Sequence, residues 1–409
     1  MLIRSLVFRK FLSALTVLSF LSAAVSLPRD ERAVAARIER VENGLLPPNV
    51  IKGRPLPRMR LADRMRHWNG VPGVSIAVIN DYKIEWARGY GVLGEGSLEA
   101  VTPETLFQAG SISKPVTAMA ALRLVQQGKL SLDEDVNKKL VSWKVPENEF
   151  TRNEKVTVRR LLSHTAGLNP TSSGDYPVGS EVPTLVQVLE GRKPANTEPV
   201  RVVSVPGGRT AYSGSHYFVL QQLLIDVTGK PFPRLMEELV FRPLGMKNST
   251  FEQPLPPALQ RRAAAGKQGA TPVEGKWHIK PEMAAAGLWT TPSDLARFAI
   301  EIQKSRRGRS NKVLSREMIN LMLSAPPAAG EDAGPGGGMG LGIELKSEGG
   351  LLRFSHGGYT TGYRCQMTAF DDGRGVVVMS NGSSQALLRE IIWGVAKEYG
   401  WPAGSLPKE

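Results

Sequence analysis

Ser111 and Lys114 are the residues whose types and spacing most clearly suggest chemistry, in the segment Phe107-Gln-Ala-Gly-Ser-Ile-Ser-Lys-Pro115. Two side chains three residues apart lie on the same face of a helix. A serine hydroxyl at the beginning of a helix meets the positive end of the helix dipole, which favours developing negative charge. A lysine beside it can accept the hydroxyl proton if desolvation keeps it neutral. The pair therefore indicates nucleophilic catalysis by Ser111 with Lys114 as its base.

The spacing alone leaves other interpretations open. Ser111 could be a helix N-cap and Lys114 a solvated charge. A second Ser-x-x-Lys occurs at Ser405 to Lys408, but it contains a proline and lies at the C-terminus. A Ser-His-Asp triad is the rival chemistry. The chain has five histidines but no Gly-x-Ser-x-Gly segment, so the lysine mechanism is the stronger hypothesis.

The apolar pattern after Ser111 predicts the helix that would hold this pair. Apolar residues recur there with helical periodicity, namely Val116, Met119, Ala120 and Leu124. Gly128 is a typical C-terminal stop. Because proline is tolerated only near the first turn, Pro115 requires the helix to begin close to Ser111.

Apolar runs near both ends of the chain predict strands. They cover residues 74–79, 82–90, 340–345, 351–355, 362–370 and 376–381. Turns are expected at Asn80-Asp81 and at Asp371-Asp372-Gly373. A helical pattern from Ser384 to Tyr399 closes the chain, and mainly helical stretches lie between the strand groups. We therefore expect an α+β fold, with one antiparallel sheet built from both chain ends and an inserted helical region.

With its surroundings, the Ser111 segment resembles the serine β-lactamase and penicillin-binding-protein superfamily. The branch it resembles most contains class C β-lactamases, D-alanyl-D-alanine carboxypeptidases, D-aminopeptidases and esterases. Similar segments follow in the family's order over residues 60–400, namely Leu161-Leu-Ser-His-Thr-Ala-Gly-Leu168, Phe241-Arg-Pro-Leu-Gly-Met246 and Ala285-Ala-Gly-Leu-Trp-Thr-Thr-Pro-Ser-Asp-Leu-Ala-Arg297. The resemblance implies a β-lactamase/transpeptidase-like fold with the site between sheet and helices.

The family's second motif, Tyr-x-Asn, corresponds to Tyr212-Ser213-Gly214. The resemblance implies that Tyr212 shuttles protons between Ser111 and the leaving group. Without it, Tyr212 could be a packed tyrosine with a bonded hydroxyl. Gly214 stands where the family's asparagine binds the acylamino group of the substrate. Glycine cannot make that contact, so we expect esters or peptides to be hydrolysed better than β-lactams.

The third motif, Lys-Thr-Gly in lactamases, corresponds to His356-Gly-Gly358, and His-x-Gly is a variant in the peptidase and aminopeptidase members. The resemblance implies that His356, Gly358 and Tyr359 bind substrate. It also implies an oxyanion hole formed by the amides of Ser111 and Tyr359. By itself, His356 is better interpreted as a core or surface imidazole without a role, and the two glycines that follow it on a strand favour the substrate-binding interpretation. His164, in the Leu-Ser-His-Thr turn, is expected to be structural.

Residues 1–26 have the composition of a secretory signal peptide. Basic residues precede an apolar run, namely Arg4, Arg9, Lys10 and then Phe11 to Val25. The run is shorter than the roughly 18 apolar residues of a membrane span, so cleavage near Ser26 is favoured over an anchor. Residues 27–60 are expected to be a lead-in segment and residues 61–400 the hydrolase domain. The mature protein is then periplasmic or secreted, without a membrane span.

Composition limits the partners and cofactors. The net charge is +14 with basic residues scattered along the chain, which favours an anionic surface, such as a membrane surface or a cell-wall polymer like peptidoglycan, over nucleic acid. The single cysteine, Cys365, excludes an internal disulfide, and its alternating strand pattern indicates a buried structural thiol rather than a nucleophile. The histidines show no metal-ligand spacing, so neither a metal nor another cofactor is expected.

These observations predict an exported serine hydrolase that forms an acyl-enzyme on Ser111. Its small-molecule or peptide substrate could be a carboxylic ester, a D-amino-acid peptide or a β-lactam amide. The alternative is a penicillin-binding sensor or cell-wall binding protein that is acylated without hydrolysis.

Overall fold

The computed structural model describes residues 29–47, 58–325 and 337–402, so the predicted signal peptide and the second Ser-x-x-Lys lie outside the described residues. A seven-stranded antiparallel sheet has the order β2-β1-β13-β12-β11-β10-β9. Its strands are β1 (Gly73–Asn80), β2 (Lys83–Gly91), β9 (Gly337–Met339), β10 (Glu344–Glu348), β11 (Leu351–Thr360), β12 (Tyr363–Phe370) and β13 (Gly375–Ser380). The predicted α+β fold, with a sheet built from both chain ends, is confirmed.

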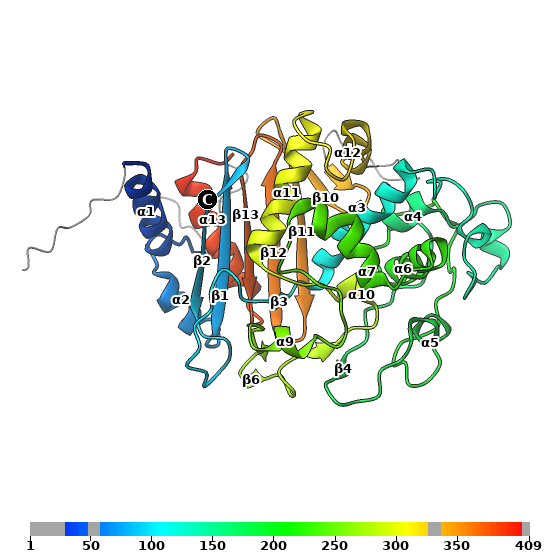
Figure 1. Cartoon of the computed structure of the whole chain (residues 1–409), viewed down its shortest axis with the longest axis horizontal. Helices are drawn as coiled ribbons and strands as arrows, with labels where there is room; N and C mark the ends of the chain where they lie inside the picture. The colour runs from blue at the N-terminus through cyan, green and yellow to red at the C-terminus, as the bar shows by residue number, and fades with distance from the viewer. Residues whose placement is uncertain (1–28, 48–57, 326–336, 403–409) are drawn as a thin grey trace, which may run out of the picture.

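Alternate residues of the central strands enter two hydrophobic cores, one on each face of the sheet. In β1, Val74, Ile76 and Val78 belong to the core that also contains residues of α1 (Arg29–Glu42), α2 (Leu61–His67) and α13 (Gln385–Glu398). Ala77 and Ile79 belong to the larger core on the other face. There α11 (Pro292–Arg306) packs on β1 and β13. Figure 1 shows this helix in front of the sheet.

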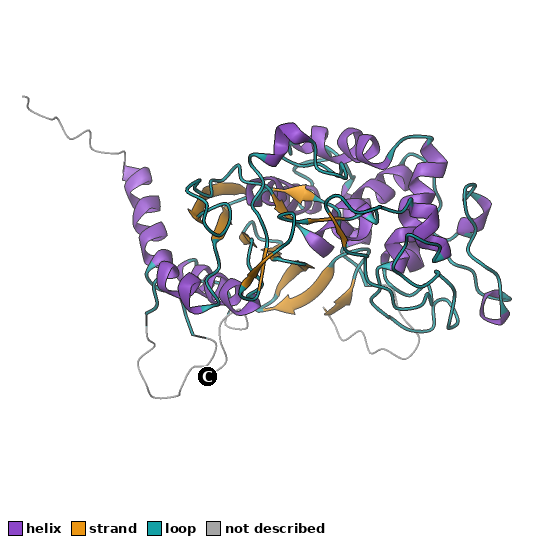
Figure 2. Cartoon of the chain, turned by 90° about the horizontal axis from the view of Figure 1, so that it is seen from below, coloured by secondary structure: helices purple, strands orange, loops and turns teal. Residues whose placement is uncertain are grey.

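The chain between β2 and β9 forms the mainly helical region, and Figure 2 shows helices on both sides of the strands. Its helical elements are η1 (Gly110–Ile112), α3 (Ser113–Gln126), η2 (Val136–Lys138), η3 (Glu149–Thr151), α4 (Val158–Leu162), α5 (Leu185–Glu190), α6 (Ser215–Thr228), α7 (Phe232–Met236), η4 (Glu237–Phe241), α8 (Arg242–Leu244), α9 (Pro257–Gln260), α10 (Met283–Ala286), α11 and α12 (Arg316–Met322). Within the described ranges, no helix is both long and apolar enough to cross a membrane.

Three short strand pairs connect loops of this region. They are β3 (Phe107–Gln108) with β8 (Trp289–Thr290), β4 (Tyr176–Pro177) with β7 (His278–Ile279), and β5 (Lys267–Gln268) with β6 (Thr271–Pro272). The first pair lies next to the Ser111 turn in sequence. The second pair places side by side two segments that lie about a hundred residues apart in the sequence. Both segments adjoin residues of the cavity described below.

Three predicted boundaries are wrong, and one of them is the strand expected over residues 351–355, which continues to Thr360 as β11. The first hairpin turns at Asp81-Tyr82 rather than Asn80-Asp81, with φ of 51° and 57°. A two-residue hairpin turn with positive φ at both residues matches the right-handed twist of its strands. The need to match this twist overrides the strand propensity of Tyr82. Residues 340–345 do not form one strand, because the chain turns between β9 and β10, with the Gly340 amide bonded to the Ile343 carbonyl at 2.8 Å.

Candidate active site

Ser111 lies in a tight turn at the entrance to α3. The 3-10 turn η1 leads directly into the helix, so the predicted helix start close to Ser111 is confirmed. The hydroxyl of Ser113 donates to the Gly110 carbonyl at 2.6 Å and accepts from the Leu288 amide at 3.0 Å. These two bonds hold the turn against the segment that follows α10. The Ser111 side chain is left half-buried on the wall of a cavity.

Lys114 lies one helical turn further, with its Nζ 3.0 Å from the Ser111 Oγ. The same nitrogen donates to the Ala285 carbonyl at 2.9 Å. Only 3% of the residue is exposed, and burial lowers the pKa of Lys114 from 10.5 to about 7. Burial has this effect because it disfavours the charged form. Near neutral pH a large fraction of Lys114 is therefore an uncharged amine with a lone pair available to Ser111.

Tyr212 faces the same cavity and is 48% exposed. Its ring centroid is 5.0 Å from Lys114 Nζ. Burial raises the pKa of Tyr212 to about 12, while hydrogen bonding with Ser111 acts in the opposite direction. The side chain is thus a neutral phenol at physiological pH. It is able to donate a proton, whereas Lys114 is the group able to accept one.

His164 holds the backbone on both sides of Tyr212. Its carbonyl accepts from the Ala211 amide at 2.8 Å, and its Nδ1 accepts from the Ser213 amide at 3.3 Å. The imidazole ring centroid is 4.4 Å from that of Tyr212, and the residue has a φ of 59°. Burial and the nearby His216 and Lys114 lower the pKa of His164, so its ring stays neutral. The sequence predicted a structural residue, but the contact with Tyr212 had no signal in the local pattern.

Strand β11 passes the Ser111 turn at very short range. A Cβ added to Gly110 would lie 2.7 Å from the Tyr359 amide nitrogen, and one added to Gly358 would overlap the Ala109 carbonyl. Glycine at both positions permits this approach. The Tyr359 amide therefore lies beside the turn that carries Ser111, an arrangement compatible with the oxyanion hole implied by the resemblance. Gly358 itself is buried and does not line the cavity.

His356 is buried beside the cavity and does not line it. It is 2% exposed and is not among the cavity-lining residues. Its Nδ1 lies 2.7 Å from the Gly357 carbonyl, its ring centroid is 6.1 Å from that of Tyr212, and burial lowers the pKa of His356 to about 3. It is a neutral imidazole beside the tyrosine. Its predicted contact with substrate stays a prediction, and from the same strand Tyr359 and Thr360 face the cavity.

Gly214 lines the cavity and packs against the loop that contains Thr171. Its amide donates to the Thr171 carbonyl at 2.7 Å. A Cβ at this position would lie 2.6 Å from the same Thr171 oxygen and 3.0 Å from the Phe218 ring. The backbone of the loop thus lies close to where an asparagine side chain would begin, which explains physically why glycine stands here.

The cavity has a volume of about 470 Å³ and brings together five of the seven predicted site residues. Its lining consists of Ser111, Lys114, Pro170, Thr171, Ser172, Ser173, Asp175, Tyr212, Ser213, Gly214, Lys280, Ala286, Tyr359, Thr360 and Thr361. Sequence reasoning missed the 170–175 loop and Lys280, which belong to no motif. Thr360, the last residue of β11, and Thr361, in the turn after it, follow the third motif and Tyr359, so their nearness to that motif was a usable signal.

The arrangement can support acyl transfer, with a nucleophile, a neutral amine and a phenol around one cavity. In the part of the chain that the structure describes, no three His, Cys, Asp or Glu side chains are grouped so as to hold a metal ion. Cys365 is buried, its Sγ lies 3.3 Å from the Gln108 carbonyl, and burial raises the pKa of the thiol to about 12. The interpretation of Cys365 as a buried thiol is confirmed.

Comparison with known sequences identifies the family of this chain. A family profile described as Beta-lactamase matches residues 60–398. The protein Flp of Staphylococcus aureus strain MW2 is 28% identical over 223 residues, which cover 54% of this chain and 42% of Flp. The D-alanyl-D-alanine-carboxypeptidase/endopeptidase AmpH of Escherichia coli K12 is 26% identical over 240 residues, covering 58% of this chain and 59% of AmpH. The matches thus span about half the length of these relatives.

Comparison with solved structures agrees. The octameric penicillin-binding protein homologue from Pyrococcus abyssi has a TM-score of 0.67 and 25% identity, over 85% of this chain and 78% of that one. The D-amino acid amidase from Ochrobactrum anthropi SV3, solved with L-phenylalanine amide, has a TM-score of 0.65 over 83% of this chain and 97% of that one. At 21% identity, the second likeness shows the fold alone.

Proposed function

Because this chain belongs to the Beta-lactamase family, we propose that it is a serine hydrolase that forms an acyl-enzyme on Ser111. The observation that carries the proposal is the 3.0 Å separation between the Ser111 hydroxyl and the Lys114 amine, with that amine buried. A serine hydroxyl is a weak nucleophile at neutral pH and needs an adjacent base. Lys114 supplies that base without requiring a histidine.

In the proposed reaction the Ser111 oxygen attacks the substrate carbonyl carbon while its proton passes to Lys114. The amides of Ser111 and Tyr359 donate to the oxygen that becomes negative. The carbonyl re-forms as the bond to the leaving group breaks, and the leaving group takes a proton from the phenol of Tyr212. Tyr212 regains a proton from Lys114, and a water molecule then hydrolyses the ester on Ser111. The products are the free acid and the amine or alcohol of the leaving group, and the Ser111 hydroxyl is restored.

The substrate we propose is an amide or ester rather than an efficiently hydrolysed β-lactam. Gly214 offers no side chain to an acylamino group, and the Thr171 carbonyl lies beside it. AmpH is named a carboxypeptidase and endopeptidase, which supports amide hydrolysis by this chain. Residues 1–26 further support export, with a cell-wall peptide as one source of substrate.

Labelling with a fluorophosphonate probe, followed by peptide mapping, tests this proposal. We expect one adduct on Ser111, its loss in Ser111→Ala, and unchanged labelling in Ser131→Ala, because Ser131 is exposed and outside the cavity. An adduct on another residue would contradict the assignment. Steady release of p-nitrophenol from p-nitrophenyl acetate would support a hydrolase. One turnover followed by a stall would instead favour the penicillin-binding sensor.

A further inference from the structure

Three charged side chains line the cavity, and only one of them is accessible. Lys114 and Lys280 are each 3% exposed. The side chain of Asp175, in contrast, is 42% exposed. Of these three side chains, a bound molecule can therefore reach the Asp175 carboxylate directly, while both lysine amines are buried in the wall.

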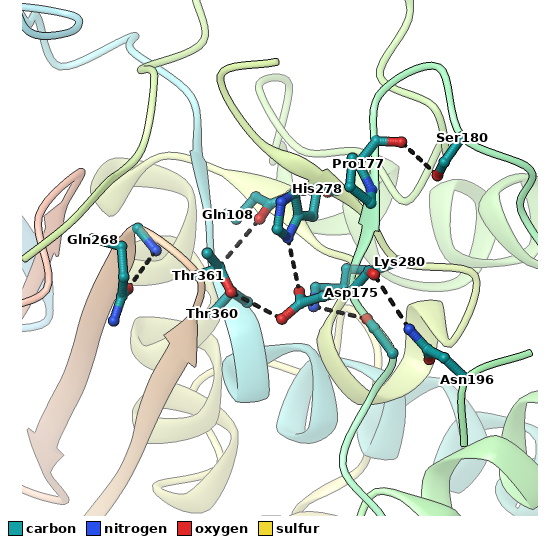
Figure 3. A network of polar contacts seen from close by, with 12 residues as sticks. Gln108, Asp175, Pro177, Ser180, Asn196, Gln268, His278, Lys280, Thr360 and Thr361 are labelled. Carbon is teal, nitrogen blue, oxygen red and sulfur yellow. Dashed lines mark hydrogen bonds and ion pairs between the residues drawn. The ribbon is translucent and has the colours of Figure 1, made fainter. Parts of the chain in front are cut away.

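The Asp175 carboxylate is held in place from three directions, as Figure 3 shows. Thr361, in the turn after β11, donates its hydroxyl to Oδ2 at 2.8 Å. Lys280 forms an ion pair with Oδ1, and the Nδ1 of His278 lies 3.3 Å from the same oxygen. Pairing of β4 with β7 brings these segments together, because it sets Tyr176 opposite Ile279. The carboxylate is thus positioned before any ligand arrives.

These contacts keep Asp175 ionised. Burial alone would raise its pKa, but His278, Lys280 and Thr361 together outweigh that effect and lower the pKa well below the ordinary value. A carboxylate has about four acceptor positions, and Oδ2 receives one described bond, from Thr361. Oδ2 therefore retains acceptor capacity on the exposed carboxylate.

Lys280 is committed to other partners. Besides its ion pair with Asp175, its Nζ donates to the Gly174 carbonyl at 2.8 Å. Its side chain is 4% exposed, so a ligand would meet the carboxylate before it met this ammonium. The local chemistry thus favours a hydrogen-bond donor with positive charge over a carboxylate ligand.

The rest of the lining is also polar. Hydroxyl groups come from Ser111, Thr171, Ser172, Ser173, Tyr212, Ser213, Tyr359, Thr360 and Thr361. Apart from glycine, the residues without a polar side chain are Pro170 and Ala286. A cavity of this kind suits a compact, hydrogen-bonding acyl group better than a long aliphatic chain.

Resting on the proposed function, we infer that Asp175 binds a protonated primary amine on the acyl portion of the substrate. Asp175 belongs to the same loop as Thr171, which packs on Gly214, and the resemblance places the acyl substituent of the substrate beside Gly214. The enzyme would then act on amides or esters of acids that carry a free amino group, such as amino-acid amides. The ammonium donates to the carboxylate while Ser111 attacks the neighbouring carbonyl.

Paired substrates test this inference. We compare alanine p-nitroanilide with N-acetylalanine p-nitroanilide, in both D and L forms, using kcat/KM. The wild-type protein should favour the free amine of at least one enantiomer by about 10- to 100-fold, because acetylation removes the charge-assisted hydrogen bond. Asp175→Asn keeps the shape and an acceptor oxygen but removes the charge, so it should lower this ratio by a similar factor.

Two further variants exclude indirect effects. Asp175→Asn leaves Lys280 buried without its partner, which can destabilise the loop. The double variant Asp175→Asn/Lys280→Met removes both charges and should lower the ratio in the same way. Glu181→Gln makes the same chemical change at an exposed position outside the cavity and should leave the ratio unchanged.

The outcomes separate the two proposals. An equal or higher rate with the acetylated substrates, or a ratio unaffected in both Asp175 variants, would overturn the role of Asp175. Fluorophosphonate labelling is measured in the same samples. Labelling of Ser111 without preference for the amine counts against Asp175 alone. If the wild-type protein is neither labelled nor active on any of these substrates, the proposed hydrolase function fails, and the inference fails with it.

Discussion

Replacing Lys114 with alanine should slow acylation of Ser111 on the order of 10²–10⁴-fold, the range typical of a lost general base. The structure indicates why lysine can act here. With a pKa of about 7, roughly three quarters of the side chain is neutral at pH 7.5, against roughly one part in a thousand at the ordinary value. Lys129→Ala is the control, because Lys129 is an exposed lysine just beyond α3.

The same reasoning predicts a pH profile. The kcat/KM for an amide or ester should rise with pH through about 7 and then level off, because the neutral amine is the active form. Tyr212, with a pKa of about 12, and His356, with one of about 3, do not titrate between pH 5 and 9. Burial also raises the pKa of Glu282 to about 7, so the profile is repeated with Glu282→Gln.

A step that persists in Glu282→Gln supports Lys114 as the titrating group. A midpoint near 10, a flat profile, or equal losses in Lys114→Ala and Lys129→Ala would refute the reasoning. The first result would show that Lys114 is not desolvated in solution. The last would show that it is an ordinary solvated charge.

Lys114 should also destabilise the folded protein. The pKa falls from 10.5 to about 7 on folding, so between these values the unfolded chain binds more protons. The free energy of unfolding therefore rises with pH across this window, by about 1.4 kcal/mol per pH unit for one proton. The full difference corresponds to ~5 kcal/mol. The gain in stability from Lys114→Met should thus be largest below pH 7 and shrink toward pH 10, as measured by urea unfolding. A gain independent of pH would contradict this.

The remaining predictions concern the residues around the nucleophile. His164→Phe should lower kcat about 10- to 100-fold with a smaller change in KM, because Tyr212 loses its position. His164→Asn should recover part of this loss in kcat, because asparagine retains a hydrogen-bond acceptor and tolerates a positive φ. If kcat and KM changed equally, and by the same amount in both variants, the result would argue against a role of His164 in positioning Tyr212. Gly358→Ala should lower the free energy of unfolding by about 3 kcal/mol, measured by urea unfolding, because its methyl overlaps the backbone. Gly337→Ala, where the Cβ meets nothing within 4 Å, should change it little. Nitrocefin should be hydrolysed with a kcat/KM below about 10⁶ M⁻¹s⁻¹, and Gly214→Asn should not raise it, because the Thr171 carbonyl obstructs the new side chain. A wild-type kcat/KM for nitrocefin above this value would refute the expectation of poor β-lactam hydrolysis.

The sequence by itself determined the features that depend on near neighbours. Ser111 and Lys114 belong to one turn-and-helix segment, so their spacing alone predicts that the two side chains lie on the same face. Strand periodicity likewise predicted β1, β12 and β13, because alternate residues of a strand face opposite sides. Prediction failed at boundaries, such as the turn at Asp81-Tyr82, where the strand twist decides the geometry.

Only the tertiary structure decided how the pair is tuned and what surrounds it. The pKa of Lys114 depends on burial, and burial comes from segments far along the chain, including Ala285. The position of Tyr212 depends on His164, which lies 48 residues earlier.

The network around Asp175 shows the same limit. It joins residues 175, 278, 280 and 361, and of these only Thr361 lies near a motif. Periodicity and spacing report which residues share one helix or strand. They carry no information about which loops meet across a cavity, because those contacts are set by the packing of the whole chain.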